Sequence, residues 1–203
     1  MTGDRRDCGP DLDLARRAIS GDGSAWHEIV ESSCDRLFAF LCYQTGERED
    51  ALDLLQETYL AAFRRLPGYR GEAPISAWLR VIALRKAIDW KRTVLRRMKK
   101  TVALRESTLT GDPPADLRVH FDSERSALYR ALTSLSPLQR AAFLLREWEE
   151  WSFAEIAQAI GTGEGTARVH YTRARRRLRK EMCAAFPAAF APEGAEEMEG
   201  QKR

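Results

Sequence analysis

Apolar residues recur at helical spacing along most of the chain, and no stretch alternates apolar β-branched residues with polar ones as a strand would. The pattern predicts an all-α protein. Helix caps and chain breakers mark the ends of four predicted helices in the first half of the chain. These run from Asp11 or Asp13 through Ile19, from Ser24 to Gly46, from about Arg48 to Leu66, and from Ser76 into a basic run. The third helix has apolar residues at helical spacing that predict a packed face: Leu52, Leu55, Tyr59, Ala62, Phe63 and Leu66.

The helical pattern fails between about Met98 and Asp122, where Thr-Gly-Asp-Pro-Pro at 110–114 cannot continue a helix. The fold class we expect is therefore two small helical domains, residues 11–97 and 123–182, joined by a flexible linker over 98–122. Residues 183–203, with two prolines and a glutamate cluster, are expected to form a disordered tail.

In the second domain, Pro137 behind Ser136 is a strong helix start. A short helix over Phe153–Ile160, a glycine-rich turn and a further helix with inward Ala167, Tyr171, Ala174 and Leu178 predict a helix-turn-helix. Its second helix would enter the major groove and present the outward residues Arg168, Val169, Thr172, Arg173 and Arg176 to DNA. An arginine-rich amphipathic helix on an ordinary bundle is the alternative.

Positive charge is concentrated in two segments, although the chain nets only +3. Residues 80–100 contain nine Lys or Arg and one acid, and residues 168–180 contain seven and no acid. Two basic helices far apart in sequence indicate a protein that holds nucleic acid at two places. Residues 1–50 hold eleven acidic and six basic residues, which fits either contact with a basic protein surface or a solvated acidic face.

Aromatic residues accompany the first basic segment. Trp78 and Trp90 lie on that helix and Tyr69 lies in the loop before it. Aromatic faces stack on unpaired bases while Arg and Lys follow the backbone, so this helix suits single-stranded nucleic acid. The alternative is that both tryptophans belong to the core, which Trp78 favours and Trp90, among charges, does not.

Other classes of protein are disfavoured. No apolar run reaches membrane length and no signal-peptide pattern follows Met1, so we expect a cytoplasmic protein without membrane insertion. The four cysteines lack metal-ligand spacing, and reduced, mostly buried thiols are expected at Cys8, Cys34, Cys42 and Cys183. Asp50, Asp53 and Glu57 share a helix face and could hold Mg²⁺ in a nuclease, but nothing supplies a nucleophile. We expect no enzyme, no metal and no cofactor.

Several segments resemble a known family. Those in the first domain are Asp53-Leu54-Leu55-Gln56-Glu57-Thr58-Tyr59-Leu60, Tyr69-Arg70-Gly71, Ala77-Trp78-Leu79 and Ala87-Ile88-Asp89. Those in the second are Leu135-Ser136-Pro137, Glu155-Ile156-Ala157 and Arg173-Ala174-Arg175-Arg176-Arg177-Leu178. In order and spacing they resemble regions 2 and 4 of bacterial extracytoplasmic-function (ECF) sigma factors, over roughly residues 11–182.

The resemblance implies a dissociable specificity subunit that binds core RNA polymerase and directs transcription initiation. It implies that Asp53, Gln56 and Glu57 dock on polymerase, and that the linker threads through it. It also implies an anti-sigma partner. Contacts to the melted −10 promoter element would come from Tyr69, Arg70, Trp78, Arg80, Arg85, Lys86 and Trp90, and contacts to the double-stranded −35 element from Arg168, Val169, Thr172, Arg173 and Arg176.

Two positions depart from the family pattern. Arg85 stands where the family often has Asn, and Val169 replaces a commonly polar residue, which implies a different −35 sequence. A free-standing helix-turn-helix regulator remains the alternative. The segment from Asp53 to Leu60 discriminates between the two, since a regulator that works without polymerase needs no docking helix.

Overall fold

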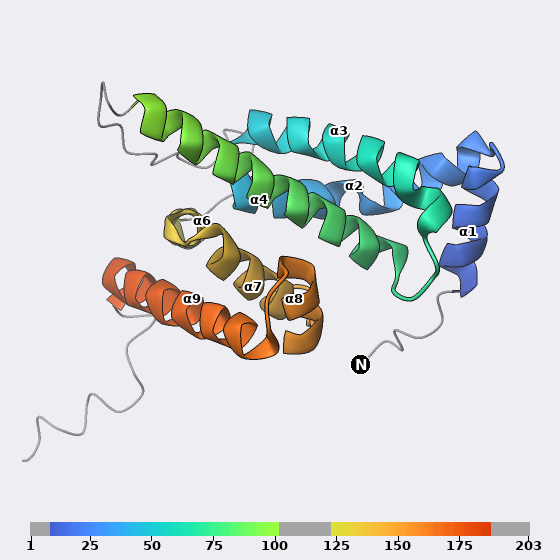
Figure 1. Ribbon diagram of the computed structural model, residues 1–203. Coiled ribbons are helices and arrows are strands. Elements are labelled where there is room, and N and C mark those ends of the chain that lie inside the picture. The colour runs from blue at the N-terminus through green and yellow to red at the C-terminus, as the bar shows by residue number, and fades with distance from the viewer. Residues whose placement is uncertain (1–8, 102–122, 188–203) are drawn as a thin grey trace, which may run out of the picture.

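The computed structural model describes residues 9–101 and 123–187, which are helical with short connections and contain no strand. The first domain consists of α1 (Gly9–Ile19), α2 (Gly23–Thr45), α3 (Arg48–Arg65), the 3₁₀ turn η1 (Leu66–Gly68) and α4 (Ile75–Thr101). The second consists of α6 (Ser123–Ser134), α7 (Pro137–Glu147), α8 (Phe153–Ile160) and α9 (Glu164–Ala185). The expected all-α fold with two helical domains is confirmed (Figure 1).

Each domain encloses apolar side chains between its helices. In the first, α2, α3 and α4 pack on one another and bury Ile29, Phe40 and Leu79. In the second, α9 lies against α6, α7 and α8 (Figure 1). The two domains also touch, because α6 and α7 pack on α2 while α7 and α8 pack on α4. The buried residues of both domains therefore form one continuous apolar cluster.

At the starts of two helices, the residue predicted to be the N-cap lies inside the helix and another residue caps it. Ser24 lies in the first turn of α2, and the cap is Asp22, whose Oδ1 accepts from the backbone N–H of Ser24 at 3.0 Å and of Ala25 at 3.3 Å. Ser76 lies inside α4, which begins at Ile75. The Ile75 N–H donates to Oδ2 of Asp11 on α1 at 2.8 Å, so a residue predicted to cap its own helix caps a distant one.

Helix ends and one helix face also differ from the prediction. Residues 98–101, assigned to the linker, continue α4, and residues 183–185, assigned to the tail, continue α9. Arg, Lys, Met and Ala are strong helix formers and prolong a helix after its apolar face has ended. Residues 102–122 and 188–203 of the predicted linker and tail lie outside the described residues. On α3, Leu52 and Phe63 are 36% and 53% exposed, while Leu54 and Thr58 are buried instead.

The predicted start of α7 is confirmed in full. The Ser136 Oγ accepts from the Gln139 N–H, the Gln139 side chain accepts from the Ser136 N–H, and Pro137 occupies the first turn. The same reciprocal capping joins Ser152 and Glu155 at the start of α8. Each cap satisfies backbone donors that the helix leaves without partners.

No disulfide joins the cysteines in the described residues. Cys42 is buried, whereas Cys34 and Cys183 are half-buried, so burial is less complete than expected. Burial raises the pKa of the Cys42 thiol to about 11, which keeps it protonated and unreactive. Cys8 lies outside the described residues.

Candidate nucleic-acid interface

The turn between α8 and α9 has the geometry that the glycines predict. Gly161 ends α8 at φ +71°, in the left-handed region that favours glycine, and the Thr162 N–H donates to the Ala157 carbonyl at 2.9 Å. The inward residues Ile156, Ala167 and Ala174 are fully buried. The predicted helix-turn-helix is therefore present, and α9 lies on the side of the second domain away from the first (Figure 1).

All the residues predicted to face DNA from this motif are exposed on α9: Arg168, Val169, Thr172, Arg173 and Arg176. Val169 is 45% exposed, a large apolar side chain without cover. Farther along, Arg173 and Arg176 line a shallow groove with Lys180. The helix thus presents a continuous basic surface with one apolar position in it.

Arg168 is held in place by its neighbours. Its guanidinium pairs with Glu164 one turn earlier at 3.0 Å and lies 4.4 Å from the ring centre of Phe153 on α8. Stacking and pairing restrict the rotamers of a long side chain, so less entropy is lost when it binds. Sequence analysis placed Phe153 at the start of the short helix and did not predict this contact.

The loop before α4 brings two predicted aromatic residues together. The ring centres of Tyr69 and Trp78 lie 5.4 Å apart, and the Tyr69 hydroxyl donates to the Ala73 carbonyl at 2.7 Å. Tyr69 is 8% exposed and Trp78 is half-buried. Both line a cavity of about 730 Å³, whose wall also includes the predicted Arg70 and Arg85.

The opposite wall of this cavity belongs to the second domain, which contributes Glu149, Trp151 and Glu155. The predicted −10 loop is therefore covered by the start of the helix-turn-helix. This arrangement follows from contacts between residues far apart in sequence, and no local pattern indicated it.

Arg80 has the surroundings of a core residue. It is 3% exposed; Nη1 donates to the Arg36 carbonyl at 3.0 Å, Nη2 pairs with Glu149 at 2.6 Å, and the guanidinium lies 5.1 Å from the ring centre of Phe40. Burial lowers the pKa of Arg80, and the Glu149 carboxylate acts in the opposite direction. Its Nε has no hydrogen-bond partner among residues 9–101 and 123–187. In this arrangement of the domains Arg80 cannot touch DNA, which the sequence prediction did not anticipate.

The remaining predicted −10 residues point toward α3. Lys86 donates to Glu57 at 2.8 Å. Trp90 is half-buried and not, as predicted, exposed to solvent. It donates a hydrogen bond to Asp50 on α3; burial raises the pKa of Asp50, and this hydrogen bond lowers it. The structure thus gathers Tyr69, Arg70, Trp78 and Arg85 at one cavity and places Lys86 and Trp90 apart from it.

The outward face of α3 contains the three residues predicted to dock on a protein. Asp53, Gln56 and Glu57 are all exposed. Leu60, 59% exposed, lies one turn after Gln56 and two turns after Asp53 on this face, and sequence analysis did not single it out. Helical spacing from the acidic and amide residues would have identified it. An exposed apolar side chain among polar ones is the usual composition of a protein-binding surface.

Two further observations concern what the described residues lack. No group of three or more His, Cys, Asp or Glu in residues 9–101 and 123–187 could hold a metal ion. Within the same ranges, no helix combines the length and apolarity needed to span a bilayer.

Comparison with known proteins identifies the family. The model of Sigma-70 region 2 matches residues 29–97, and that of Sigma-70, region 4, matches residues 125–178. ECF RNA polymerase sigma factor SigM of Mycobacterium tuberculosis (strain ATCC 25618 / H37Rv) is 30% identical, over 83% of this chain and 82% of SigM. The chain belongs to the ECF sigma factor family.

Two other similar proteins extend the comparison. ECF RNA polymerase sigma factor SigG of M. tuberculosis (strain CDC 1551 / Oshkosh) is 33% identical over 76% of this chain, which spans about half (48%) of the length of SigG. Sigma factor RpoE, solved in complex with the anti-sigma factor NepR from Bartonella quintana, is 22% identical with a TM-score of 0.64, over 77% of this chain and 95% of RpoE. The RpoE structure shows that this ECF sigma factor shares its fold.

Proposed function

We propose that this ECF sigma factor binds core RNA polymerase and directs it to promoters through −10 and −35 elements. The observation that carries the proposal is that one chain combines an exposed acidic and apolar face on α3 with the basic face of α9. A free-standing regulator would need the second surface and not the first.

For the −35 element, α9 supplies the contacts. Arg168 and Arg173 have the donor geometry to reach guanine edges, and the methyl groups of Val169 and Thr172 suit thymine. Arg176 and the basic residues after it would hold phosphates, which adds affinity that falls with salt.

For the −10 element, the aromatic pair Tyr69 and Trp78 supplies stacking surfaces, with Arg70 and Arg85 beside them for the backbone. Arg80, Lys86 and Trp90 belong to the proposed site only once the partners seen here release them. Arg85 in place of an amide would favour a phosphate or guanine over the base usually read there.

For polymerase, the proposed docking surface is the outward face of α3. Asp53, Gln56 and Glu57 would meet basic side chains, and Leu60 would enter an apolar pocket between them. We also propose an anti-sigma partner, the class of protein bound to RpoE in its structure, and a place in the cytoplasm with the polymerase. The protein would contribute specificity and no catalysis of its own.

The docking proposal is tested by reversing charge at Asp53 and Glu57 together. The matched control reverses Glu28 and Glu31, exposed acids on α2, and changes net charge by the same amount. Like charges across an interface cost several kcal/mol, so the Asp53→Lys/Glu57→Lys variant should bind core polymerase about 100-fold more weakly. Affinity is measured by fluorescence anisotropy of labelled protein, with helical content checked by circular dichroism. Undiminished binding, or an equal loss in the control, would remove the docking role from α3.

A further inference from the structure

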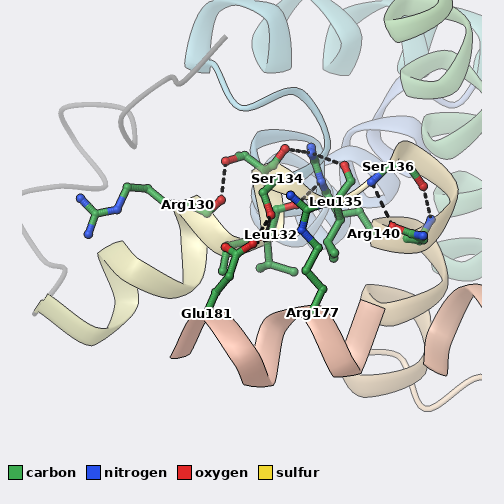
Figure 2. Close-up of polar contacts among 11 residues, drawn as sticks. Arg130, Leu132, Ser134, Leu135, Ser136, Arg140, Arg177 and Glu181 are labelled. Atoms are coloured by element: carbon green, nitrogen blue, oxygen red, sulfur yellow. Dashed lines mark hydrogen bonds and ion pairs between the residues drawn. The ribbon is translucent and has the colours of Figure 1, made fainter. Parts of the chain in front are cut away.

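The contact between the two domains includes polar contacts at both of its ends. At one end, the C-terminal carbonyls of α2 receive donors from the second domain: Nη1 of Arg140 donates to Tyr43 at 2.9 Å and to Gln44 at 2.6 Å, and the Tyr129 hydroxyl donates to Cys42 at 3.3 Å. Arg140 lies near the start of α7 and is 1% exposed (Figure 2). Because the last carbonyls of a helix lack internal partners, these donors fix where the second domain sits.

At the other end, the contact covers the cavity of Tyr69 and Trp78. The loop between α7 and α8 inserts Glu149 against Arg80, and Trp151 beside it is only 7% exposed. Glu155 lines the same cavity as Arg85. An acidic edge of the second domain therefore faces the basic residues of α4 and its loop.

A carboxylate and a phosphate compete for the same partner. Both accept charge-assisted hydrogen bonds from a guanidinium, and the geometry that suits one suits the other. The Nη2 atom of Arg80 gives its short contact to Glu149, and no phosphate can reach it while that pair is closed. The predicted DNA-facing residues of α9 are all exposed, as are Arg70 and Arg85, whereas Tyr69 and Arg80 are buried.

Resting on the −10 role proposed above, we infer that the second domain is a reversible cover for the first, with Glu149 occupying on Arg80 the place of a −10 phosphate. The closed chain leaves the −35 helix accessible and withholds Arg80. Opening must release both the Arg80–Glu149 pair and the bonds to the end of α2. Binding of single-stranded DNA is therefore weakened by the fraction of molecules that are closed.

The test compares two substitutions that remove the same charge from neighbouring positions. Glu149→Gln breaks the pair with Arg80, whereas Glu150→Gln alters an exposed side chain that does not contact it. The probe is a fluorescein-labelled single-stranded DNA 20-mer of random sequence, titrated with full-length protein at fixed salt. Opening is followed separately by the radius of gyration from small-angle X-ray scattering, and folding by circular dichroism.

We expect Glu149→Gln to enlarge the radius of gyration and to tighten binding of the 20-mer by about threefold or more, with Glu150→Gln unchanged in both. Equal tightening in the two variants would mean a simple charge effect and would overturn the inference. So would an unchanged radius of gyration. A variant that opens without binding more tightly would refute the inhibitory role. The proposed function is tested independently, by polymerase-dependent transcription.

Discussion

Arg140 is the buried charge on which the α6–α7 turn depends. Its Nε donates to the Leu132 carbonyl at 2.7 Å, and Nη2 donates to Thr133 at 2.6 Å and Leu135 at 3.2 Å (Figure 2). These three acceptors belong to the second domain; the bonds to Leu132 and Leu135 are buried, and the bond to Thr133 is half-buried. In Arg140→Met the side chain keeps an unbranched apolar stem and loses every donor.

The expected loss follows from counting acceptors. A buried acceptor left without a donor costs about 1–3 kcal/mol. The Leu132 carbonyl keeps the Leu135 N–H as a donor at 3.1 Å. The loss therefore comes from the carbonyls of Thr133 and Leu135 and is about 3 kcal/mol in all. Burial of the charged guanidinium lowers the pKa of Arg140 to about 10. Replacing Arg140 by Met removes the free-energy cost of burying that charge, which offsets part of the loss in stability. The free energy of unfolding should therefore fall by about 3 kcal/mol, a large share of the stability of a small domain.

The assay is urea unfolding followed by circular dichroism at 222 nm. With a slope of about 2 kcal/mol per molar urea, the midpoint should fall by about 1.5 M in Arg140→Met. Arg130→Met on α6 is the control, because that side chain is exposed, and should change stability by about 0.5 kcal/mol at most. Equal midpoints for the two variants would refute the reasoning that the carbonyls depend on Arg140.

Two further predictions concern a cap and the reading helix. Hydrogen bonds from Ser24 and Arg17 lower the pKa of Asp22 from 3.8 to about 2, so the Asp22 charge stabilises the fold above pH 3.8 and this contribution is lost as pH falls through 2. The difference in melting temperature between wild type and Asp22→Asn should therefore disappear over that pH range. A difference that stays constant would contradict the prediction. Arg168→Ala should lose roughly 1–3 kcal/mol of promoter binding and relax preference at one −35 base pair, whereas Arg179→Ala should weaken all sequences evenly. Unchanged −35 preference in Arg168→Ala would mean that the reading face is misassigned.

Local signals predicted the helices well because caps and breakers act within one turn. The capping box at Ser136, the span of α8 and the exposed face of α9 all follow from residues three or four apart. The α3 face was less well predicted, since Leu52 and Phe63 fit helical spacing as well as the buried Leu54 does.

Long-range contacts account for what the sequence could not reveal. Asp11 caps α4 across 64 positions, and Arg80, predicted to meet DNA, pairs with Glu149 of the other domain. A basic residue in a basic run gives no local sign that a distant carboxylate will bury it. The sequence predicted that aromatic and basic residues would meet near Tyr69. It did not predict that residues of the second domain would line the same cavity.

Transcription in vitro tests the central claim most directly. Bacterial core RNA polymerase is supplied with genomic DNA fragments, with and without this protein, and transcript 5′ ends are mapped. We expect discrete transcripts that require the protein, share a −35 and a −10 sequence upstream of their start sites, and disappear with Asp53→Lys/Glu57→Lys. Sequence-specific binding of duplex DNA by the protein alone, together with no polymerase-dependent transcript, would contradict the sigma factor proposal and favour the free-standing regulator.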